Sequence, residues 1–366
     1  MSRKKLKQEK VKTKKSCDMD IKHKNEAVKV NIKYIAEVSG TSCSTVSRAL
    51  RGDNTASKET AEKILKIARE LNYYPNMLAK GLRDKKTKTI GIILNDLKNP
   101  LYYETIKVIE EILNDLDYTM LLCDSNFDLK LERKNIITML SKGVDGIIIS
   151  PVNIKSENIE LISSKGLNAV YIDFAPEMEN INYVHVSHAD AAFMATEYLI
   201  GKGHTKILLL TGPEQLSVSK DFYKGYAKSL SKNGIPLNKA LVKYAVTSID
   251  GGDRVIREMY PLKQSGESND FTAVLCVSDM LAIGVYEASK KLGFKVPDDL
   301  SVMGYDNIFM TPYLAPPLTT IHAPKIRIGE LSIKILLDRI EDRDREFHRI
   351  MLDVRLVERE SVKKIN

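Results

Sequence analysis

The segment TSCSTVSRALRG, residues 41–52, decides how the first part of this 366-residue chain is interpreted. The spacing of Val46, Ala49 and Leu50 fits one face of a short helix. Serine, threonine and cysteine fill the first turn, where a helix packed into a core would carry Leu or Ile. Side chains this small and polar predict a polar partner opposite the start of the helix.

Two further helices are expected on either side of this segment. One begins after Asn31, a good N-cap residue, and ends at Gly40. The other begins at Ser57, carries Glu59 in its first turn and stops before Pro75. A helix, a tight turn at a glycine and a second helix with a small polar first turn is the helix-turn-helix pattern.

A helix of this kind suits the major groove of DNA. A recognition helix must bring short polar side chains to base edges and phosphates, because bulky ones would hold it out of the groove. Ser42 is the expected N-cap, and Arg48 can contact guanine or a phosphate. The other side chains expected at this interface are Thr41, Cys43, Ser44, Thr45 and Ser47.

The charge distribution supports a polyanionic partner. Residues 1–88 hold 23 Lys and Arg against 10 Asp and Glu, whereas the remaining residues hold 33 against 38. A basic head on a mildly acidic body indicates that the head contacts the polyanion and the body does not. Residues 1–29 are expected to be a basic, disordered extension.

Composition limits the class of protein. With 366 residues and 43% hydrophobic content, two or three folded units are expected. No run of 18 apolar residues exists, so no membrane helix is expected, and the cationic N-terminus lacks the apolar stretch of a signal peptide. The four cysteines are far apart and form no metal-binding or redox spacing, which is typical of reduced thiols in a cytoplasmic protein.

Beyond residue 88, hydrophobic strands alternate with amphipathic helices, beginning with TIGIIL at residues 89–94. This alternation predicts parallel sheets with helices on both faces, and the chain is long enough for two such lobes. The segment PPLTTI, residues 316–321, is expected to cross late between the lobes, before a last long helix at 326–340. The expected fold class is therefore α/β, with an all-α helix-turn-helix headpiece before the two lobes.

Polar residues follow the predicted strands, at the edge where parallel sheets bind ligands. Repeated carboxylates suit a hydroxyl-rich ligand, because each accepts hydrogen bonds from neighbouring hydroxyl groups. We expect Asp124 and Asp306 to cap the next helix instead, and Asp173 and Asp279 to face the ligand. Asn95 and Asp96, which follow the first strand, are further candidates for ligand contacts.

The N-terminal segments resemble a known family. IAEVSGTSCSTVSRAL, YYPNMLAKGL and IGII recur at the spacing of the lac-repressor (LacI/GalR) family of bacterial transcription regulators, and the resemblance covers about residues 30–360. It implies a homodimer that binds a near-palindromic double-stranded DNA operator, and a two-lobed core related to periplasmic binding proteins. It also identifies Asn31 as a residue at the DNA interface.

The resemblance implies four regions along the chain. These are the extension at 1–29, the helix-turn-helix domain at 30–75, a hinge helix and linker at 76–88, and the effector-binding and dimerisation domain at 89–366. Lobe 1 is expected at about 89–186 and 320–343, and lobe 2 at about 187–319 and 344–366.

The hinge is expected to fold only on DNA, because six residues containing Gly81 cannot form a stable helix alone. In the resembled family the paired hinge helices enter the minor groove, where a leucine acts as a wedge between base steps. Asn76, Ala79 and Leu82 are the corresponding DNA-contacting residues here.

The effector side chains implied by the resemblance depart from the family pattern. Tyr102 and Tyr103 match aromatic residues that close over the ligand. Phe222 stands where an Arg is usual, so that Lys220 or another group would have to replace a planar, bidentate donor. Ser187 and His188 replace a frequent Asp-Asn pair. An unusual sugar, a phosphosugar, a nucleobase or a partner protein therefore remain open as the effector.

No enzyme motif is present: the chain lacks a Walker loop, a GxSxG sequence and a dinucleotide-binding fingerprint. Neither a metal nor a cofactor is expected. The sequence predicts a cytoplasmic, nucleoid-associated repressor whose operator affinity is set by a sugar-like effector between the lobes. The alternatives are control of the same DNA binding by a protein coregulator, and a cytoplasmic solute-binding protein with an incidental basic head.

Overall fold

A computed structural model describes residues 30–52, 57–73, 86–260, 271–342 and 344–365 of the chain. The chain divides into two compact units, Met1–Lys80 and Gly81–Asn366. The basic extension and the hinge residues Asn76, Ala79 and Leu82 lie outside the described residues.

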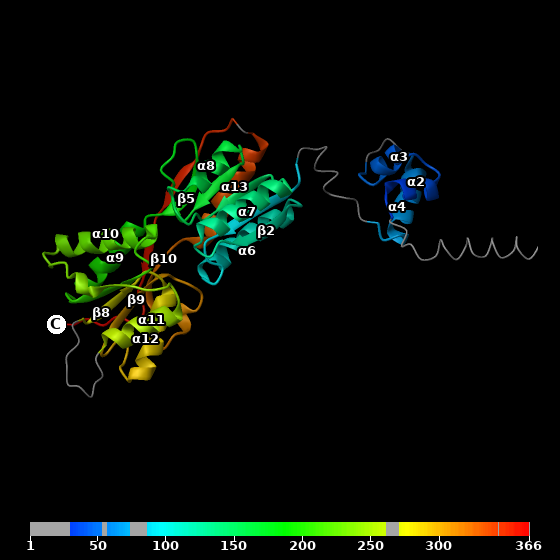
Figure 1. Cartoon of the computed structure of the whole chain (residues 1–366). Coiled ribbons are helices and arrows are strands. Elements are labelled where there is room, and N and C mark those ends of the chain that lie inside the picture. Colours follow the sequence, from blue (N-terminus) through cyan, green and yellow to red (C-terminus); the bar gives the residue numbers. More distant parts are fainter. Residues whose placement is uncertain (1–29, 53–56, 74–85, 261–270, 343, 366) are drawn as a thin grey trace, which may run out of the picture. The chain divides into compact units, whose positions relative to one another are not determined.

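The described part of the first unit, called the headpiece, is a bundle of three helices (Figure 1). They are α2 (Ile32–Ser39), α3 (Cys43–Ala49) and α4 (Lys58–Glu70), each preceded by a capping side chain from Asn31, Ser42 or Ser57. Gly40 ends α2 with a φ of 69°, a left-handed conformation that glycine adopts without strain. The fully buried Ile35, Val46 and Ile64 form the core. The expected helix-turn-helix is confirmed.

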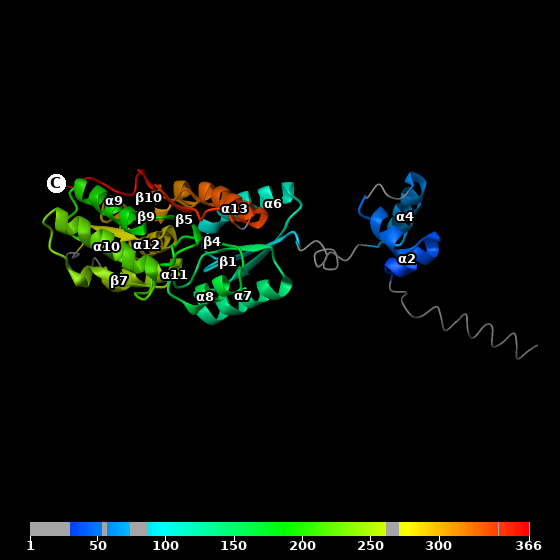
Figure 2. The ribbon, with the colours of Figure 1, turned by 90° about the horizontal axis from the view of Figure 1, so that it is seen from above.

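Lobe 1 of the second unit contains a six-stranded parallel sheet in the order β11-β5-β4-β3-β1-β2. Its strands are β1 (Thr89–Leu94), β2 (Thr119–Asp124), β3 (Gly146–Ile149), β4 (Ala169–Ile172), β5 (Asn182–Val186) and β11 (Arg349–Leu352). One face is covered by α6 (Leu101–Asp115) and α13 (Lys325–Glu341), the other by α7 (Leu129–Lys142) and α8 (Glu157–Ser164) (Figure 2).

Lobe 2 contains a second six-stranded sheet in the order β12-β10-β9-β8-β6-β7. Its strands are β6 (Ile207–Thr211), β7 (Val242–Tyr244), β8 (Ala273–Cys276), β9 (Ser301–Asp306), β10 (Thr319–His322) and β12 (Arg355–Val357). The helices α9 (His188–Gly201) and α10 (Ser217–Lys232) pack together on one face, and α11 (Ile249–Met259) and α12 (Asp279–Leu292) on the other (Figure 1). Two short 3₁₀ helices, η1 (Lys239–Leu241) and η3 (Thr311–Tyr313), lie in the connections.

The expected lobe boundaries need correction. We expected residues 320–343 in lobe 1 and 344–366 in lobe 2, but β10 pairs with β9 in lobe 2, and β11 pairs with β5 in lobe 1. The chain therefore passes between the lobes after β5, after β10 and after β11. Lobe 2 also has one antiparallel strand, β12. A hydrophobic run indicates where a strand lies, but its partner is decided by tertiary packing.

The central strands are buried along nearly their whole length. Every residue of β3, β6, β8 and β9 is buried, as expected of parallel strands covered by helices on both faces. The two-lobed α/β fold expected from the alternation is thereby confirmed. Within the described ranges, no helix combines the length and the apolar character that crossing a membrane would need.

Candidate functional site

The first turn of α3 presents a row of hydroxyl groups on the headpiece surface. The Ser42 hydroxyl accepts a hydrogen bond from the Thr45 backbone N–H at 3.1 Å. It also lies 2.7 Å from the hydroxyl of Ser44 and 2.9 Å from that of Thr45. Ser42, Cys43, Ser44 and Arg48 are exposed, and Thr41, Thr45 and Ser47 are half-buried.

The opposite side of α3 holds the helix on the bundle. Val46 and Ala49 are buried there, so the polar side must face outward. The Lys63 ammonium donates to the Ser39 carbonyl at 2.9 Å and ties α4 to the turn before α3. The helix that carries Arg48 is therefore held on a rigid support, as a recognition helix requires. Asn31 is exposed, and its side chain accepts from the Tyr34 N–H at 3.0 Å.

In the second unit, two adjoining cavities lie between the lobes, where the sheet strands end. The inner cavity has a volume of about 80 Å³, and the outer cavity of about 920 Å³. Asn99, Phe127, Leu216 and Thr247 line both, so the outer cavity opens onto the inner one.

The lobe 1 wall of the inner cavity is a closed hydrogen-bond network around Asp173. One Asp173 carboxylate oxygen lies 2.6 Å from the Tyr102 hydroxyl and accepts from the Ser150 hydroxyl at 2.5 Å. Asn95 donates to Ser150 at 2.9 Å, and its amide oxygen lies 2.7 Å from the Tyr102 hydroxyl. Burial and the Asp173 charge raise the pKa of Tyr102 well above its usual value, so the phenol stays protonated. Asp173 itself has a φ of 64°, which is unusual for a residue other than glycine.

His188 joins this wall to lobe 2. Its Nε2 lies 3.1 Å from the Asp173 backbone carbonyl, and its Nδ1 lies 3.0 Å from the Tyr305 hydroxyl. Because a carbonyl only accepts, Nε2 must carry the proton, and Nδ1 accepts from Tyr305. Burial lowers the pKa of His188, which favours this neutral ring.

Lys325 and Asp306 form another connection between the lobes. Lys325, at the start of α13, is only 1% exposed, and its ammonium donates to the backbone carbonyls of Asp306 at 2.9 Å and Asn307 at 3.0 Å. Glu104 lies 3.7 Å from the same ammonium. Burial and the nearby Asp279 charge raise the pKa of the Asp306 carboxyl group.

The expected capping roles of two aspartates are corrected. Asp306 lines the inner cavity in a left-handed conformation, φ 114°, and caps no helix. Asp124 accepts from the Asn126 N–H at 2.8 Å in a turn, while Asp128 caps α7. Strand ends of this kind can lead into a turn or a cavity as readily as into a helix.

Of the residues expected at the effector site, Asn95, Tyr102 and Asp173 line the inner cavity, and Asp96 lines the outer one. Tyr103 does not join them: it is 62% exposed on α6, and its ring lies 6.3 Å from that of Phe309. Adjacent residues on a helix point in different directions, and here Tyr102 is buried at the cavity whereas Tyr103 faces outward.

Asp279 lies beneath the cavity instead of lining it. It is fully buried, and its carboxylate accepts from the Thr320 hydroxyl at 2.7 Å and the Ile308 N–H at 2.8 Å. Burial raises its pKa to about 7. The neighbouring Ser278 lines the cavity in its place. The residue at this strand end that lines the cavity is therefore one position before the one we expected.

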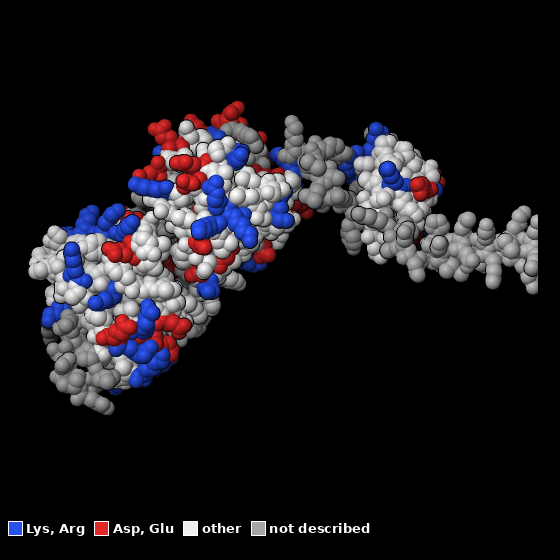
Figure 3. All heavy atoms as spheres, in the orientation of Figure 1, with Lys and Arg blue, Asp and Glu red and all other residues white. Residues whose placement is uncertain are grey.

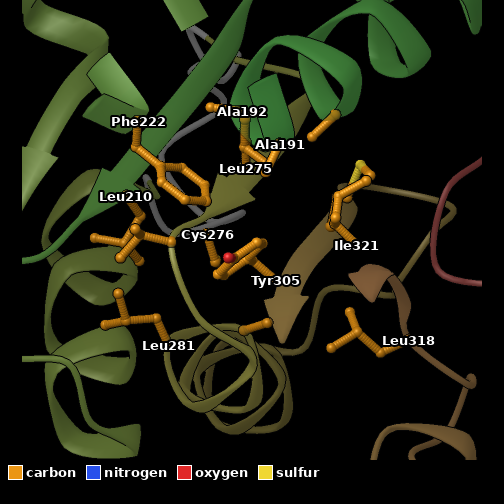
Figure 4. Close-up of a cluster of buried hydrophobic side chains, with 14 of the residues drawn as sticks. Ala191, Ala192, Leu210, Phe222, Leu275, Cys276, Leu281, Tyr305, Leu318 and Ile321 are labelled. Carbon is orange, nitrogen blue, oxygen red and sulfur yellow. The ribbon is translucent and has the colours of Figure 1, made fainter. Parts of the chain in front are cut away.

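Neither Phe222 nor Lys220 lines the inner cavity. Phe222 is fully buried, and its ring meets that of Tyr305 at 5.0 Å in an edge-on contact among aliphatic side chains (Figure 4). Lys220 lines a different cavity and does not replace the missing Arg. The sequence missed Asn99, Ser150, Ser278, Tyr305 and Lys325, since no local signal marks which side chains of folded strands and helices converge.

Among the described residues, no group of three or more His, Cys, Asp or Glu side chains is arranged to hold a metal ion. The polar groups of the inner cavity are hydrogen-bond donors and acceptors that their own hydrogen bonds hold in place. Such a set can bind and orient a small polar molecule.

Comparisons with known proteins match both units. The family model described as bacterial regulatory proteins, lacI family, matches residues 31–76, and that of a periplasmic binding protein-like domain matches residues 196–362. Over 337 residues the chain is 33% identical to the HTH-type transcriptional repressor PurR of Photobacterium profundum, covering 92% of this chain and 99% of that one. It is 34% identical to the ribose operon repressor of Haemophilus influenzae, covering 90% of this chain and 98% of the relative.

Solved structures give the same result. The lac repressor dimer bound to operator and the anti-inducer ONPF has a TM-score of 0.77 at 26% identity, covering 91% of this chain and 99% of that one. A LacI family regulator of Enterococcus faecium with bound ribose has a TM-score of 0.67 at 28% identity, covering 76% of this chain and all of that one.

Proposed function

Because the chain belongs to the LacI family of bacterial transcriptional regulators, a family of DNA-binding repressors rather than of enzymes, we propose that it represses transcription from a near-palindromic operator. The observation that carries the proposal is the exposed polar turn of α3 on its buried support. Such a protein acts where the chromosome is, in the cytoplasm.

In this proposal α3 lies in the major groove. Arg48 is exposed and forms no ion pair with any described residue, so that its guanidinium is available for a guanine or a phosphate. Ser44, Thr45 and Ser47 donate hydroxyl hydrogen bonds to the backbone of the DNA. Residues 76–82, outside the described ranges, are proposed as the hinge that contacts the minor groove.

The inner cavity is proposed as the effector site. Asp173 and Asp306 provide carboxyl groups, while two donors of the buried Lys325 are already bonded to carbonyls. This lining favours an uncharged ring bearing hydroxyl or amino groups over an anionic one. Ribose, bound to the Enterococcus faecium relative, is of this kind.

We propose that the inner cavity enlarges when such a ligand binds wholly within it and does not extend into the outer cavity. Its volume of about 80 Å³ holds only a few water molecules, whereas small-molecule sites are typically ~300–1,000 Å³. We therefore infer that the lobes move apart or rotate on binding. A coupling of ~1–3 kcal/mol between this movement and the hinge would make a useful switch.

A homodimer is supported by an apolar patch on the second unit. Tyr103 and Phe309, whose ring centroids lie 6.3 Å apart, are 62 and 57% exposed. Large exposed apolar side chains that lie together indicate an interaction site. The lac repressor structure similar to this chain is a dimer, and a second copy is the proposed occupant of this patch.

Selection from a pool of random DNA duplexes with the full-length chain tests the proposal. We expect enrichment of one near-palindromic sequence, because two headpieces of a symmetric dimer read two related half-sites. A pool that stays random after repeated rounds would contradict a sequence-specific regulator.

A further inference from the structure

The inner cavity has two unlike walls, and their difference narrows the class of effector that the proposed site would bind. Lobe 1 contributes the hydrogen-bond network of Asp173, Tyr102 and Asn95. Lobe 2 contributes a surface that we call the lobe 2 wall, which consists of His188, Leu216, Val218, Val277 and Tyr305. Leu216 and Val218 lie at the start of α10, and Val277 directly follows β8, so three side chains of this wall present only hydrocarbon.

The two polar rings of the lobe 2 wall use their hydrogen bonds within the protein. His188 Nε2 donates to the Asp173 backbone carbonyl at 3.1 Å, and His188 Nδ1 accepts from the Tyr305 hydroxyl at 3.0 Å. His188 therefore has no ring nitrogen left for a ligand, and Tyr305 has no proton left to donate. What the two rings offer a ligand is mainly their carbon surface.

Two hydroxyl side chains from lobe 2 also line the inner cavity. Ser278 is 2% exposed and caps α12, where its hydroxyl accepts from the Leu281 N–H at 3.3 Å. Thr247 lines both cavities, so it lies where the outer cavity opens onto the inner one. Ser278 is thus almost covered and Thr247 is at the entrance, and the lobe 2 wall between them stays apolar.

The side chain behind the lobe 2 wall adds no donor. Phe222 stands where the resembled family usually has an arginine, and its buried ring lies 5.0 Å from that of Tyr305 and 6.4 Å from that of His188. A guanidinium would supply up to about five N–H donors, whereas a phenyl ring supplies none. Phe174 of lobe 1 extends the aromatic surface, since its ring lines the cavity 5.1 Å from that of His188.

This apolar surface is unfavourable for a sugar. A ring sugar carries hydroxyl groups around its whole edge, so some of them would meet the lobe 2 wall without a hydrogen-bond partner. Each buried, unpaired hydroxyl lowers affinity by roughly tenfold or more. A flat heteroaromatic ring instead has two faces without hydrogen-bonding groups, and such faces pack favourably on aromatic and aliphatic side chains. The apolar side chains of the cavity therefore fit the faces of a flat ring.

The free polar groups of the cavity fit the edge of the same kind of ring. One oxygen of Asp173 bonds to Tyr102 and Ser150, while its other oxygen accepts from no group in the described part of the chain. Burial and the Asp279 charge raise the pKa of Asp306, which favours the protonated carboxyl group, a donor. An acceptor and a donor together suit a nitrogen heterocycle, whose amino groups donate and whose ring nitrogens and oxo groups accept.

The charge of the cavity favours a neutral ligand. Lys and Arg side chains are spread, together with Asp and Glu, over the face of the second unit that Figure 3 shows. Among the described residues that line the inner cavity, by contrast, Lys325 is the one Lys or Arg. Two of its donors bind backbone carbonyls, and Glu104 lies 3.7 Å from its ammonium. An anionic ligand would therefore meet a cation that is already engaged.

We propose that the effector is a flat, uncharged nitrogen heterocycle of the nucleobase class. Its amino and oxo groups face Asp173 and Asp306, and its apolar faces pack on Phe174, Leu216 and Val218. This inference rests on the proposed effector site between the lobes and names the class of ligand that the site selects.

Thermal unfolding of the full-length chain with adenine, hypoxanthine, cytosine and uracil, and with ribose, glucose and galactose, tests the class. We expect a saturable rise in the unfolding temperature with at least one base, at concentrations at least tenfold below those at which any of the sugars acts. Stabilisation by a sugar and by none of the bases would overturn the class and leave the effector site intact. Stabilisation by no compound would contradict both the class and the small-molecule site.

Phe174→Leu tests whether the stabilising base packs on the aromatic surface of the cavity. Loss of the ring should weaken binding of that base several-fold. Phe193→Leu is the matched control and should bind like the parent, because Phe193 lies on α9 under the Lys228 ammonium and does not line the inner cavity. Equal binding by the parent and Phe174→Leu would place the base elsewhere and overturn the proposal.

Val218→Thr tests the lobe 2 wall, because it keeps the shape of the side chain and adds one hydroxyl group. We expect the variant to bind the base several-fold more weakly, since the apolar face of the ring would cover the added hydroxyl without pairing with it. The unfolding temperature without ligand shows whether the variant folds like the parent. Binding as tight as that of the parent, or tighter, would show that this wall meets polar groups of the ligand and would contradict the proposed orientation.

Discussion

The tip of α3 and the lobe 1 wall of the inner cavity both consist of small polar side chains, but they use them differently. At α3, Ser42, Ser44 and Arg48 are exposed on a support held by buried Val46. At the cavity, Asp173, Ser150 and Tyr102 are bonded to one another over distances of 2.5–3.2 Å. The first surface is ready for a large external partner, whereas the second is a preorganised network that a small ligand must join.

The largest effect should come from removing the support of α3. Ile64→Ala deletes a fully buried side chain from the small headpiece core, at a cost of about 2–5 kcal/mol. We expect loss of the headpiece unfolding transition and of operator binding, with the transition of the second unit unchanged. Leu65→Ala, at a neighbouring position that is 37% exposed, is the control. Calorimetry that showed equal effects of both variants would contradict the core assignment.

The second largest effect is expected at the lobe 1 wall of the inner cavity. Asp173→Asn keeps the shape of the wall but removes the charge that a ligand donor would meet, at a cost of about 1.5–3 kcal/mol, or roughly tenfold or more in affinity. Thermal shift of the full-length chain against ribose and other neutral sugars or nucleobases is the measurement. Asp96→Asn, in the outer cavity, should retain the response. If no compound stabilises the parent, a protein coregulator becomes the better explanation of the regulation.

Arg48→Ala tests the exposed surface itself. Losing a contact to a base or phosphate should weaken operator binding by about 1–3 kcal/mol without changing the unfolding temperature. Lys66→Ala changes an exposed residue on α4 and should weaken operator binding less, because Lys66 is not on the recognition helix. Operator titrations in which both variants bind like the parent would remove α3 from the interface.

The smallest effect concerns pH at the junction of the lobes. Since burial lowers the pKa of His188 in the folded state, its neutral form contributes stability that is complete above the unfolded pKa of about 6.5. That contribution is lost as the pH falls through the lower folded value. His188→Gln should therefore make the decline in stability below pH 6.5 shallower than in the parent. Equal slopes in chemical unfolding would show that His188 does not titrate in this way.

The sequence predicted the headpiece well because its signals are local. Ser42 caps α3, and Val46 and Ala49 are the buried positions that the helical spacing required. The cleft was predicted only in part, since Asn95, Tyr102 and Asp173 line it but Asp279, Phe222 and Lys220 do not. Those three depend on how α10 and α12 rotate against the second sheet, which no short segment encodes.

The lobe crossings illustrate the same limit. We expected the chain from residue 320 in lobe 1 and the chain from residue 344 in lobe 2, yet β10 pairs with β9 in lobe 2 and β11 pairs with β5 in lobe 1. Asp306 was expected to cap a helix and instead lines the inner cavity beside Lys325, a residue that no local pattern singled out. Contacts between distant segments decide these roles.

The central claim is that this chain reads a particular DNA sequence, so the specificity ratio tests it most directly. The dissociation constant of the full-length chain should be measured for the selected site and for a scrambled duplex of equal length and composition, at one physiological salt concentration. The account predicts at least ~10³-fold tighter binding of the selected site. Equal affinity for the two duplexes would mean that the basic head binds DNA only through its charge, and would contradict the account.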